Sequence, residues 1–179
     1  MENALNQETK KRLGNGPRIV LYILATLAAL AVLAAAVFAP FIRVYGNSMA
    51  PTLEAGDVVV CAKTGAYQCG DVVAFTHNGK TLVRRIIAGP GNWVSIGEDG
   101  SVTVDGVALE EPYLAEYAFG QCDLEFPYQV PDGQYFVLGD DRADAVDSRS
   151  SVVGCVAEDQ IQGEILFRVW PLAGFGGVN

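Results

Sequence analysis

An unbroken apolar segment near the start of the chain precedes shorter runs in which apolar residues alternate with polar ones. Residues 19–42, IVLYILATLAALAVLAAAVFAPFI, hold no charged residue over 24 positions. A helix needs about 20 apolar residues to cross the hydrocarbon core of a bilayer. We therefore expect a transmembrane helix over 19–42, which Pro40 ends or kinks near its far end.

Basic residues precede this segment and indicate its orientation, because the cytoplasmic flank of a membrane helix carries an excess of lysine and arginine. They are Lys10, Lys11, Arg12 and Arg18. We expect a cytoplasmic N-terminus over 1–18, an anchor in the cytoplasmic membrane over 19–42, and a domain on the outer face over 43–179. The alternative is a cleaved signal peptide ending near Ala34–Ala36, but the apolar core of such a peptide spans only about 7–15 residues.

Beyond Ile42 the pattern changes to short runs rich in valine and isoleucine, which are typical of strands. These runs lie within 57–63, 71–77, 81–89, 93–109, 133–140 and 163–171, and the turn signals between them include Asn78-Gly79, Asp99-Gly100 and Asp105-Gly106. No stretch after Ile42 keeps a helical period over about ten residues. The predicted fold class is mainly β, an antiparallel β domain attached to one N-terminal transmembrane helix.

The expected outer domain is acidic, which limits its partners. It holds eight lysines and arginines against 19 aspartates and glutamates, a net charge of −11. Binding to nucleic acid requires a basic face, so this balance argues against nucleic acid as a partner.

Four cysteines, Cys61, Cys69, Cys122 and Cys155, all lie in the expected outer domain. An even number outside the cytoplasm permits two disulfides with three connectivities. Cys61 and Cys69 flank an expected hairpin tip, which favours one bridge between them and a second between Cys122 and Cys155. Four unpaired thiols are the alternative. No Cys-x-x-Cys pair occurs, so no zinc site is expected.

The segment 46–53, GNSMAPTL, places a serine shortly after the apolar segment. Gly46 permits a tight turn whose backbone N–H groups can face an oxyanion. A serine hydroxyl is a weak nucleophile unless a base lies within hydrogen-bond reach. Ser48 is therefore a candidate nucleophile, although an ordinary turn serine is the commoner case.

Few side chains offer that base. The chain has one histidine, His77, and it precedes the Asn78-Gly79 turn, where an exposed loop residue is expected. A lysine can act as a base when burial lowers its pKa. Lys63 follows an expected strand and Lys80 follows a turn, so both are expected to be solvated surface residues. Residue patterns alone therefore assign no base.

Six blocks of the expected outer domain resemble, in order, those of the type I signal peptidases, the membrane-anchored serine proteases that remove signal peptides from exported proteins. The blocks are GNSMAPTLEAGDVVV (46–60), GDVVAF (70–75), VRRIIAGPGN (83–92), SVTVDGVALEEPYL (101–114), VLGDDRADAVDSRS (137–150) and GEILFRVWPL (163–172). The resemblance extends from Val44 to Leu172. The single anchor and small size are most similar to the Gram-positive form.

This resemblance implies roles for individual residues. Ser48 corresponds to the nucleophile, and its amide, with Gly46 nearby, to the oxyanion site. Asp147 and Arg149 correspond to a structural ion pair. The residues expected to line shallow pockets for an Ala-x-Ala cleavage site are Val44, Met49, Leu53, Leu82 and Val83. The resemblance further implies an acyl-enzyme route with no cofactor and no metal, and as partners the signal peptides of exported preproteins and membrane lipid.

Three positions depart from that family. Its catalytic lysine corresponds to Arg84, and a guanidinium cannot be deprotonated in proteins. Its second serine, which orients the lysine, corresponds to Ala145, and Asp141 stands where asparagine is usual. The first two changes affect one hydrogen-bond pair, so the expected base for Ser48 is absent.

Three functions are therefore compatible with the sequence. The first is a signal peptidase that cleaves after Ala-x-Ala. The second is a catalytically impaired homologue that acts as a binding or pilus-assembly accessory factor. The third is an anchored β domain that binds no peptide.

Overall fold

The structure is a computed structural model that describes residues 16–38 and 40–178, and it divides into two units, Met1–Ala39 and Pro40–Asn179. In the first unit, helix α2 spans Gly16–Phe38. Its side chains from Arg18 to Ala31 are exposed. Within the described residues, no helix combines the length and the apolar character that crossing a membrane requires. Residues 1–15 of the expected cytoplasmic segment lie outside the described part of the chain.

The second unit is built from short antiparallel strands and two single turns of 3₁₀ helix, η1 (Glu158–Gln160) and η2 (Leu172–Gly174). The strands are β1 (Phe41–Arg43), β2 (Val58–Ala62), β3 (Val72–His77), β4 (Lys80–Ala88), β5 (Trp93–Ile96), β6 (Val102–Val104), β7 (Val107–Ala108), β8 (Tyr128–Gln129), β9 (Gln134–Leu138), β10 (Val156–Ala157), β11 (Ile161–Trp170) and β12 (Gly176–Gly177). The prediction of a mainly β, antiparallel domain is therefore confirmed.

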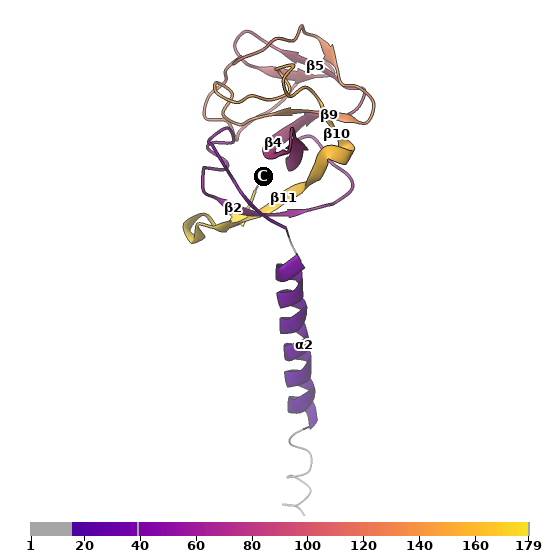
Figure 1. Cartoon of the computed structure of the whole chain (residues 1–179), viewed down its shortest axis with the longest axis vertical. Helices are drawn as coiled ribbons and strands as arrows, with labels where there is room; N and C mark the ends of the chain where they lie inside the picture. Colours follow the sequence, from indigo (N-terminus) through magenta and orange to yellow (C-terminus); the bar gives the residue numbers. More distant parts are fainter. Residues whose placement is uncertain (1–15, 39, 179) are drawn as a thin grey trace, which may run out of the picture. The chain divides into compact units, whose positions relative to one another are not determined.

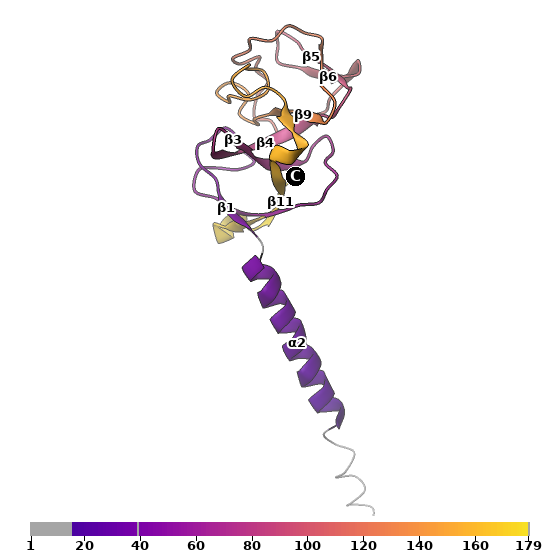
Figure 2. The same cartoon turned by 45° about the vertical axis from the view of Figure 1, so that its right-hand side comes forward.

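These strands form two sheets. The larger has the order β1-β2-β11-β3-β4-β9-β10, with β12 paired to β11, and the smaller has the order β7-β6-β5-β8. In Figures 1 and 2 the small sheet lies at one end of the β domain and the strands β1, β2 and β11 lie at the other. Strands β4 and β9 lie between these two ends.

Apolar side chains from both sheets fill three core clusters. One contains Ile87 and Phe136 of the large sheet together with Val94 of the small one, so it joins the two sheets. Another lies beneath β2, β3 and β11 and includes Val59 and Ile165. The strands that carry most of these residues are those that the valine- and isoleucine-rich runs predict.

Two sequence expectations need correction. Phe41 and Ile42, the last apolar residues of the expected anchor, pair with β2 as part of β1. The favoured bridge between Cys61 and Cys69 is not formed, and all four cysteines are free thiols. Cys61 points into the core, where burial raises its pKa to about 11, while Cys69 is exposed.

Candidate active site

Ser48 lies in the loop that joins β1 to β2. Backbone bonds from Val44 N to the Asp57 carbonyl, 2.8 Å, and from Gly56 N to the Val44 carbonyl, 3.0 Å, close the base of this loop. Within it, the side chains of Met49 and Leu53 are buried in the core beneath β2 and β11. These anchors fix the loop and leave Ser48 half-buried beside β4.

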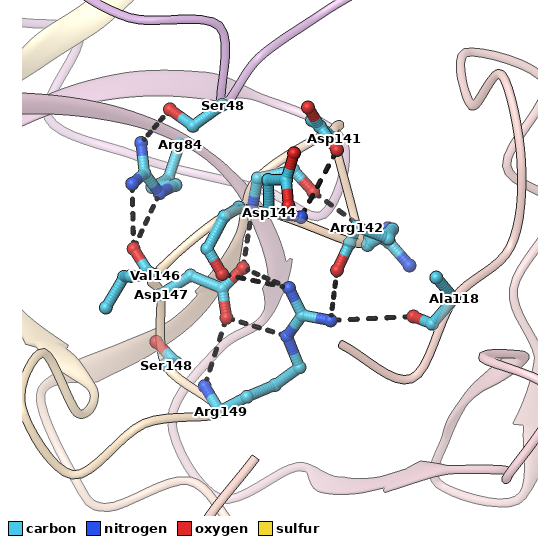
Figure 3. A network of polar contacts seen from close by, with 12 residues as sticks. Ser48, Arg84, Ala118, Asp141, Arg142, Asp144, Val146, Asp147, Ser148 and Arg149 are labelled. Carbon is cyan, nitrogen blue, oxygen red and sulfur yellow. Dashed lines mark hydrogen bonds and ion pairs between the residues drawn. The ribbon is translucent and has the colours of Figure 1, made fainter. Parts of the chain in front are cut away.

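Strand β4 brings Arg84 to Ser48. Nη1 of Arg84 donates to Ser48 Oγ at 2.8 Å and to the Val83 carbonyl at 2.6 Å. Its Nε and Nη2 both donate to the Val146 carbonyl, at 3.2 and 2.7 Å (Figure 3). Because Arg84 is only 6% exposed, these bonds hold the guanidinium in one position beside the hydroxyl.

The group beside Ser48 is therefore a proton donor. Burial lowers the pKa of Arg84; the charge of Asp147 opposes this effect and that of Arg149 adds to it. An arginine nevertheless stays protonated in proteins. Its positive charge favours a negative charge on Ser48 Oγ, but it cannot accept the proton that Ser48 must lose.

The other candidate bases lie elsewhere. His77 Nε2 lies 2.9 Å from Asn78 Nδ2 at the tip of the β3–β4 hairpin. Lys63 and Lys80 are exposed. None of the three lines the pocket that holds Ser48. Over residues 40–178, then, no lysine or histidine is placed to take a proton from Ser48.

That pocket has a volume of about 120 Å³. It is lined by residues 42–45, by Ser48 and Met49, and by residues 81–84 of β4. Val44, Met49, Leu82 and Val83, which the resemblance places there, are among these residues. Leu53 is not, because its side chain is fully buried in the core below the loop. Gly46 takes a left-handed conformation, with φ of 79°, at the turn into the nucleophile segment.

A second loop, residues 139–149, packs against the Ser48 turn. The amide of Asp141 donates to the Ser48 carbonyl at 3.2 Å, a bond that is independent of its side chain. Gly139 lies so close that an added Cβ would stand 2.5 Å from the Ser48 carbonyl and would also meet the Cβ of Ala145. Only glycine fits at this position without a shift of the nucleophile segment.

The 139–149 loop is held by a buried ion pair. Arg149 Nη2 donates to Asp147 Oδ2 at 2.8 Å and its Nε to Oδ1 at 2.9 Å. Asp147 Oδ2 also accepts from the amide of Gly139 at 2.9 Å. The other amino group of Arg149 donates to the carbonyl of Arg142 at 2.8 Å (Figure 3). It also donates to the carbonyl of Phe119 at 2.8 Å.

Sequence reasoning missed a further set of contacts around the Ser48 turn. Asp140 accepts from Thr52 Oγ1 and forms an ion pair with Arg85 at 2.7 Å. The Arg85 guanidinium lies 3.8 Å from the centroid of the Tyr113 ring. The Tyr113 hydroxyl donates to Glu111 at 2.7 Å, and Glu111 pairs with a buried arginine, Arg142. In the sequence, the only signals of this network are two short charged runs, Arg84-Arg85 in β4 and Asp140-Asp141-Arg142 in the 139–149 loop.

Among the described residues, no group of three or more His, Cys, Asp or Glu side chains is arranged to hold a metal ion. The polar groups at the nucleophile segment are the Ser48 hydroxyl, the Ser48 amide N–H and the fixed guanidinium of Arg84.

Comparison with known proteins gives consistent matches. The family described as "Signal peptidase, peptidase S26" matches residues 17–170. The chain is 31% identical over 173 residues to signal peptidase I U of Bacillus subtilis, covering 90% of this chain and 91% of that protein. It is 37% identical over 150 residues to signal peptidase IB of Staphylococcus aureus, covering 73% and 77%. A solved signal peptidase I from Enterococcus faecalis V583 shares 31% identity at a TM-score of 0.48, covering 55% of this chain and 96% of that one.

Proposed function

Because this chain belongs to the signal peptidase family, peptidase S26, we propose that it binds the signal peptides of exported proteins beside Ser48 and hydrolyses them with Ser48 as the nucleophile. The observation that carries the proposal is the position of Ser48 in a pocket bounded by β1 and β4. The small volume of this pocket favours small side chains at the two alanine positions of an Ala-x-Ala sequence, since larger side chains do not fit.

The strand edges beside this pocket support an extended peptide as the substrate. Over residues 81–83, β4 pairs only with β3, because its pairing with β9 begins at Arg85. Strand β1 pairs only with β2, so one edge of it is also unpaired. A peptide that adds a strand to such edges gains main-chain hydrogen bonds while its alternate side chains enter pockets.

The chemistry follows from the groups around Ser48. Its hydroxyl attacks the peptide carbonyl of the small residue, and the amide N–H of Ser48 with Gly46 nearby stabilises the oxyanion. The C–N bond then breaks as the leaving amine takes a proton from solvent, and water hydrolyses the acyl-enzyme to the free carboxylate. Arg84 favours the developing alkoxide by its charge, and the proton passes to solvent because no side-chain base accepts it. We therefore expect hydrolysis to be slow and to depend on hydroxide concentration.

A second candidate is a role in binding or pilus assembly without hydrolysis. The bond from Arg84 Nη1 to Ser48 Oγ favours it, since this contact places a donor where a serine protease has its base. Both candidates use the same pocket, so they differ only in whether the peptide is cut.

Cleavage of a synthetic preprotein segment containing Ala-x-Ala by the full chain in detergent tests the proposal. We expect one cut after the second alanine, no cut with Ser48→Ala, and a rate that rises with pH beyond neutrality without a plateau, because no titrating base limits it. Mass spectrometry of the products and initial rates across pH measure these results. Binding of the segment with no cut at any pH would favour the second candidate instead.

We also propose that the part of the apolar segment that precedes β1, residues 19–40, anchors the chain in the cytoplasmic membrane, with the β domain on the outer face. The absence of charged residues from this part of the sequence and the basic residues before it support this placement. Protease added to intact cells should degrade the β domain and leave an N-terminal epitope tag protected. A β domain that is protected in intact cells and cut only after lysis would contradict the proposal.

A further inference from the structure

Arg84 differs from the other buried arginines of the β domain in the groups that surround it. Arg85 pairs with a carboxylate of Asp140, and two more buried arginines, Arg142 and Arg149, each pair with a carboxylate of their own. The acceptors of Arg84 are two backbone carbonyls and the Ser48 hydroxyl. Within residues 40–178, no carboxylate lies within ion-pair distance of its guanidinium.

The carboxylate whose charge acts on Arg84 is that of Asp147, which is already ion-paired with Arg149. Both oxygens of Asp147 accept from Arg149, and one also accepts from the amide of Gly139. A buried charge whose partners are all neutral is unfavourable unless an opposite charge approaches it. An anion that enters the Ser48 pocket would therefore meet a guanidinium that is only 6% exposed and is not ion-paired with a carboxylate of residues 40–178.

Further donors line the same pocket. Four donor contacts of the Arg84 guanidinium go to protein acceptors, and a guanidinium carries five N–H groups. The Ser48 hydroxyl accepts from Arg84, while its own proton has no acceptor among residues 40–178. In the same part of the chain the amide N–H of Ser48 donates to no protein group. The two adjoining pocket residues Ser48 and Arg84 thus carry a guanidinium, a hydroxyl and an amide that can donate to a ligand.

We infer that this pocket binds the C-terminal α-carboxylate of a peptide that ends in a small residue, the chemistry of a signal peptide after its release. The carboxylate accepts from Arg84, from the Ser48 hydroxyl and from the Ser48 amide. The apolar side chains of Met49 and Val83 beside these donors suit the methyl group of a terminal alanine. The inference rests on the proposed function only in that a peptide lies in this pocket, and it does not require the peptide to be cut.

The charge of Arg84 makes the carboxylate a better ligand than the uncleaved peptide bond. A hydrogen bond to a charged group is stronger than a neutral one, and a free carboxylate supplies the charge that a peptide carbonyl lacks. The released signal peptide should therefore stay bound and compete with the next substrate.

Two peptides that differ only at the C-terminus test this inference. Both end in Ala-x-Ala and carry a fluorophore at the N-terminus, one as the free acid and the other as the amide, and their binding to the full chain in detergent is measured by anisotropy. We expect the acid to bind about ten-fold tighter than the amide or more. Equal affinity, or binding of neither peptide, would overturn the inference.

Variants identify the side chain that causes the preference for the free acid. Arg84→Gln should bring the acid-to-amide ratio close to one while amide binding persists. Lys63→Gln is the control for charge, because Lys63 is an exposed cation that does not line the pocket, and it should leave the ratio unchanged. A ratio that falls as much with Lys63→Gln as with Arg84→Gln would assign the preference to surface charge and contradict the role of Arg84. Since binding alone is measured, this result is independent of whether the chain cleaves a preprotein.

Discussion

Arg84→Lys combined with Ala145→Ser is expected to raise the rate of Ala-x-Ala peptide hydrolysis by about 10²–10⁴-fold, the usual contribution of a positioned base. Arg84 Nη1 lies 2.8 Å from Ser48 Oγ, so the side chain at position 84 already reaches the hydroxyl. A lysine in the same buried place has its pKa lowered by desolvation, which leaves a neutral amine able to accept the proton. Initial rates with a fluorogenic Ala-x-Ala peptide measure the change.

The second substitution is needed because of how the guanidinium is held. Arg84 makes two bonds to the Val146 carbonyl, whereas an ammonium group lacks the planar fork that makes them. Ala145 is buried directly before Val146, and the resemblance places at this position the serine that orients the lysine, so Ala145→Ser is expected to supply that hydroxyl. Arg84→Lys alone should therefore give a smaller gain than the pair.

Two controls separate a restored base from other causes. Arg84→Gln removes the charge without adding a base and should give no comparable gain. Adding Ser48→Ala to the double variant should abolish hydrolysis, because the nucleophile is lost. If the natural chain already cleaves within ten-fold of the double variant, Arg84 does not impair the site and the proton leaves by a route other than the one proposed.

The strands of the β domain could be predicted from local pattern, but their order could not. The valine-rich runs correspond to β2 and β3, and the turn at Asn78-Gly79 has the positive φ angles, 48° and 73°, that such a dipeptide favours. The insertion of β11 between β2 and β3 joins residues about 100 positions apart, and no local period records that pairing. Strands of two residues, such as β8, are too short to carry any pattern.

For the candidate site, too, some features could be predicted from the sequence and others could not. The resemblance of the blocks predicted that Ser48 and Arg84 belong to one site, and the two side chains do meet. It could not predict that Leu53 lies under the loop rather than in the pocket, because both positions require an apolar residue. The bond between Thr52 and Asp140 joins residues 88 positions apart. Such a contact depends on tertiary packing and leaves no trace in either segment alone.

Asp147→Asn is expected to lower the free energy of unfolding of the β domain by about 3–5 kcal/mol, the range for breaking a buried ion pair from one side. Asp147 is fully buried, and the substitution leaves the guanidinium of Arg149 without its carboxylate. For a domain of this size the loss corresponds to a fall in Tm of roughly 10 °C. Thermal unfolding followed by circular dichroism measures it.

Asparagine has nearly the same shape as aspartate, so the loss of stability in Asp147→Asn must come from changes in charge and hydrogen bonding. Asp147 Oδ1 accepts from Arg149 Nε, and Oδ2 accepts from Arg149 Nη2 and from the amide of Gly139. Either orientation of an asparagine amide turns its NH₂ group toward one of these donors, which leaves buried donors without an acceptor. Arg168→Gln is the matched control, because the ion pair of Arg168 with Asp57 is partly exposed and should cost only about 1 kcal/mol. Equal losses for the two variants would show that the buried pair does not hold the 139–149 loop against the Ser48 turn.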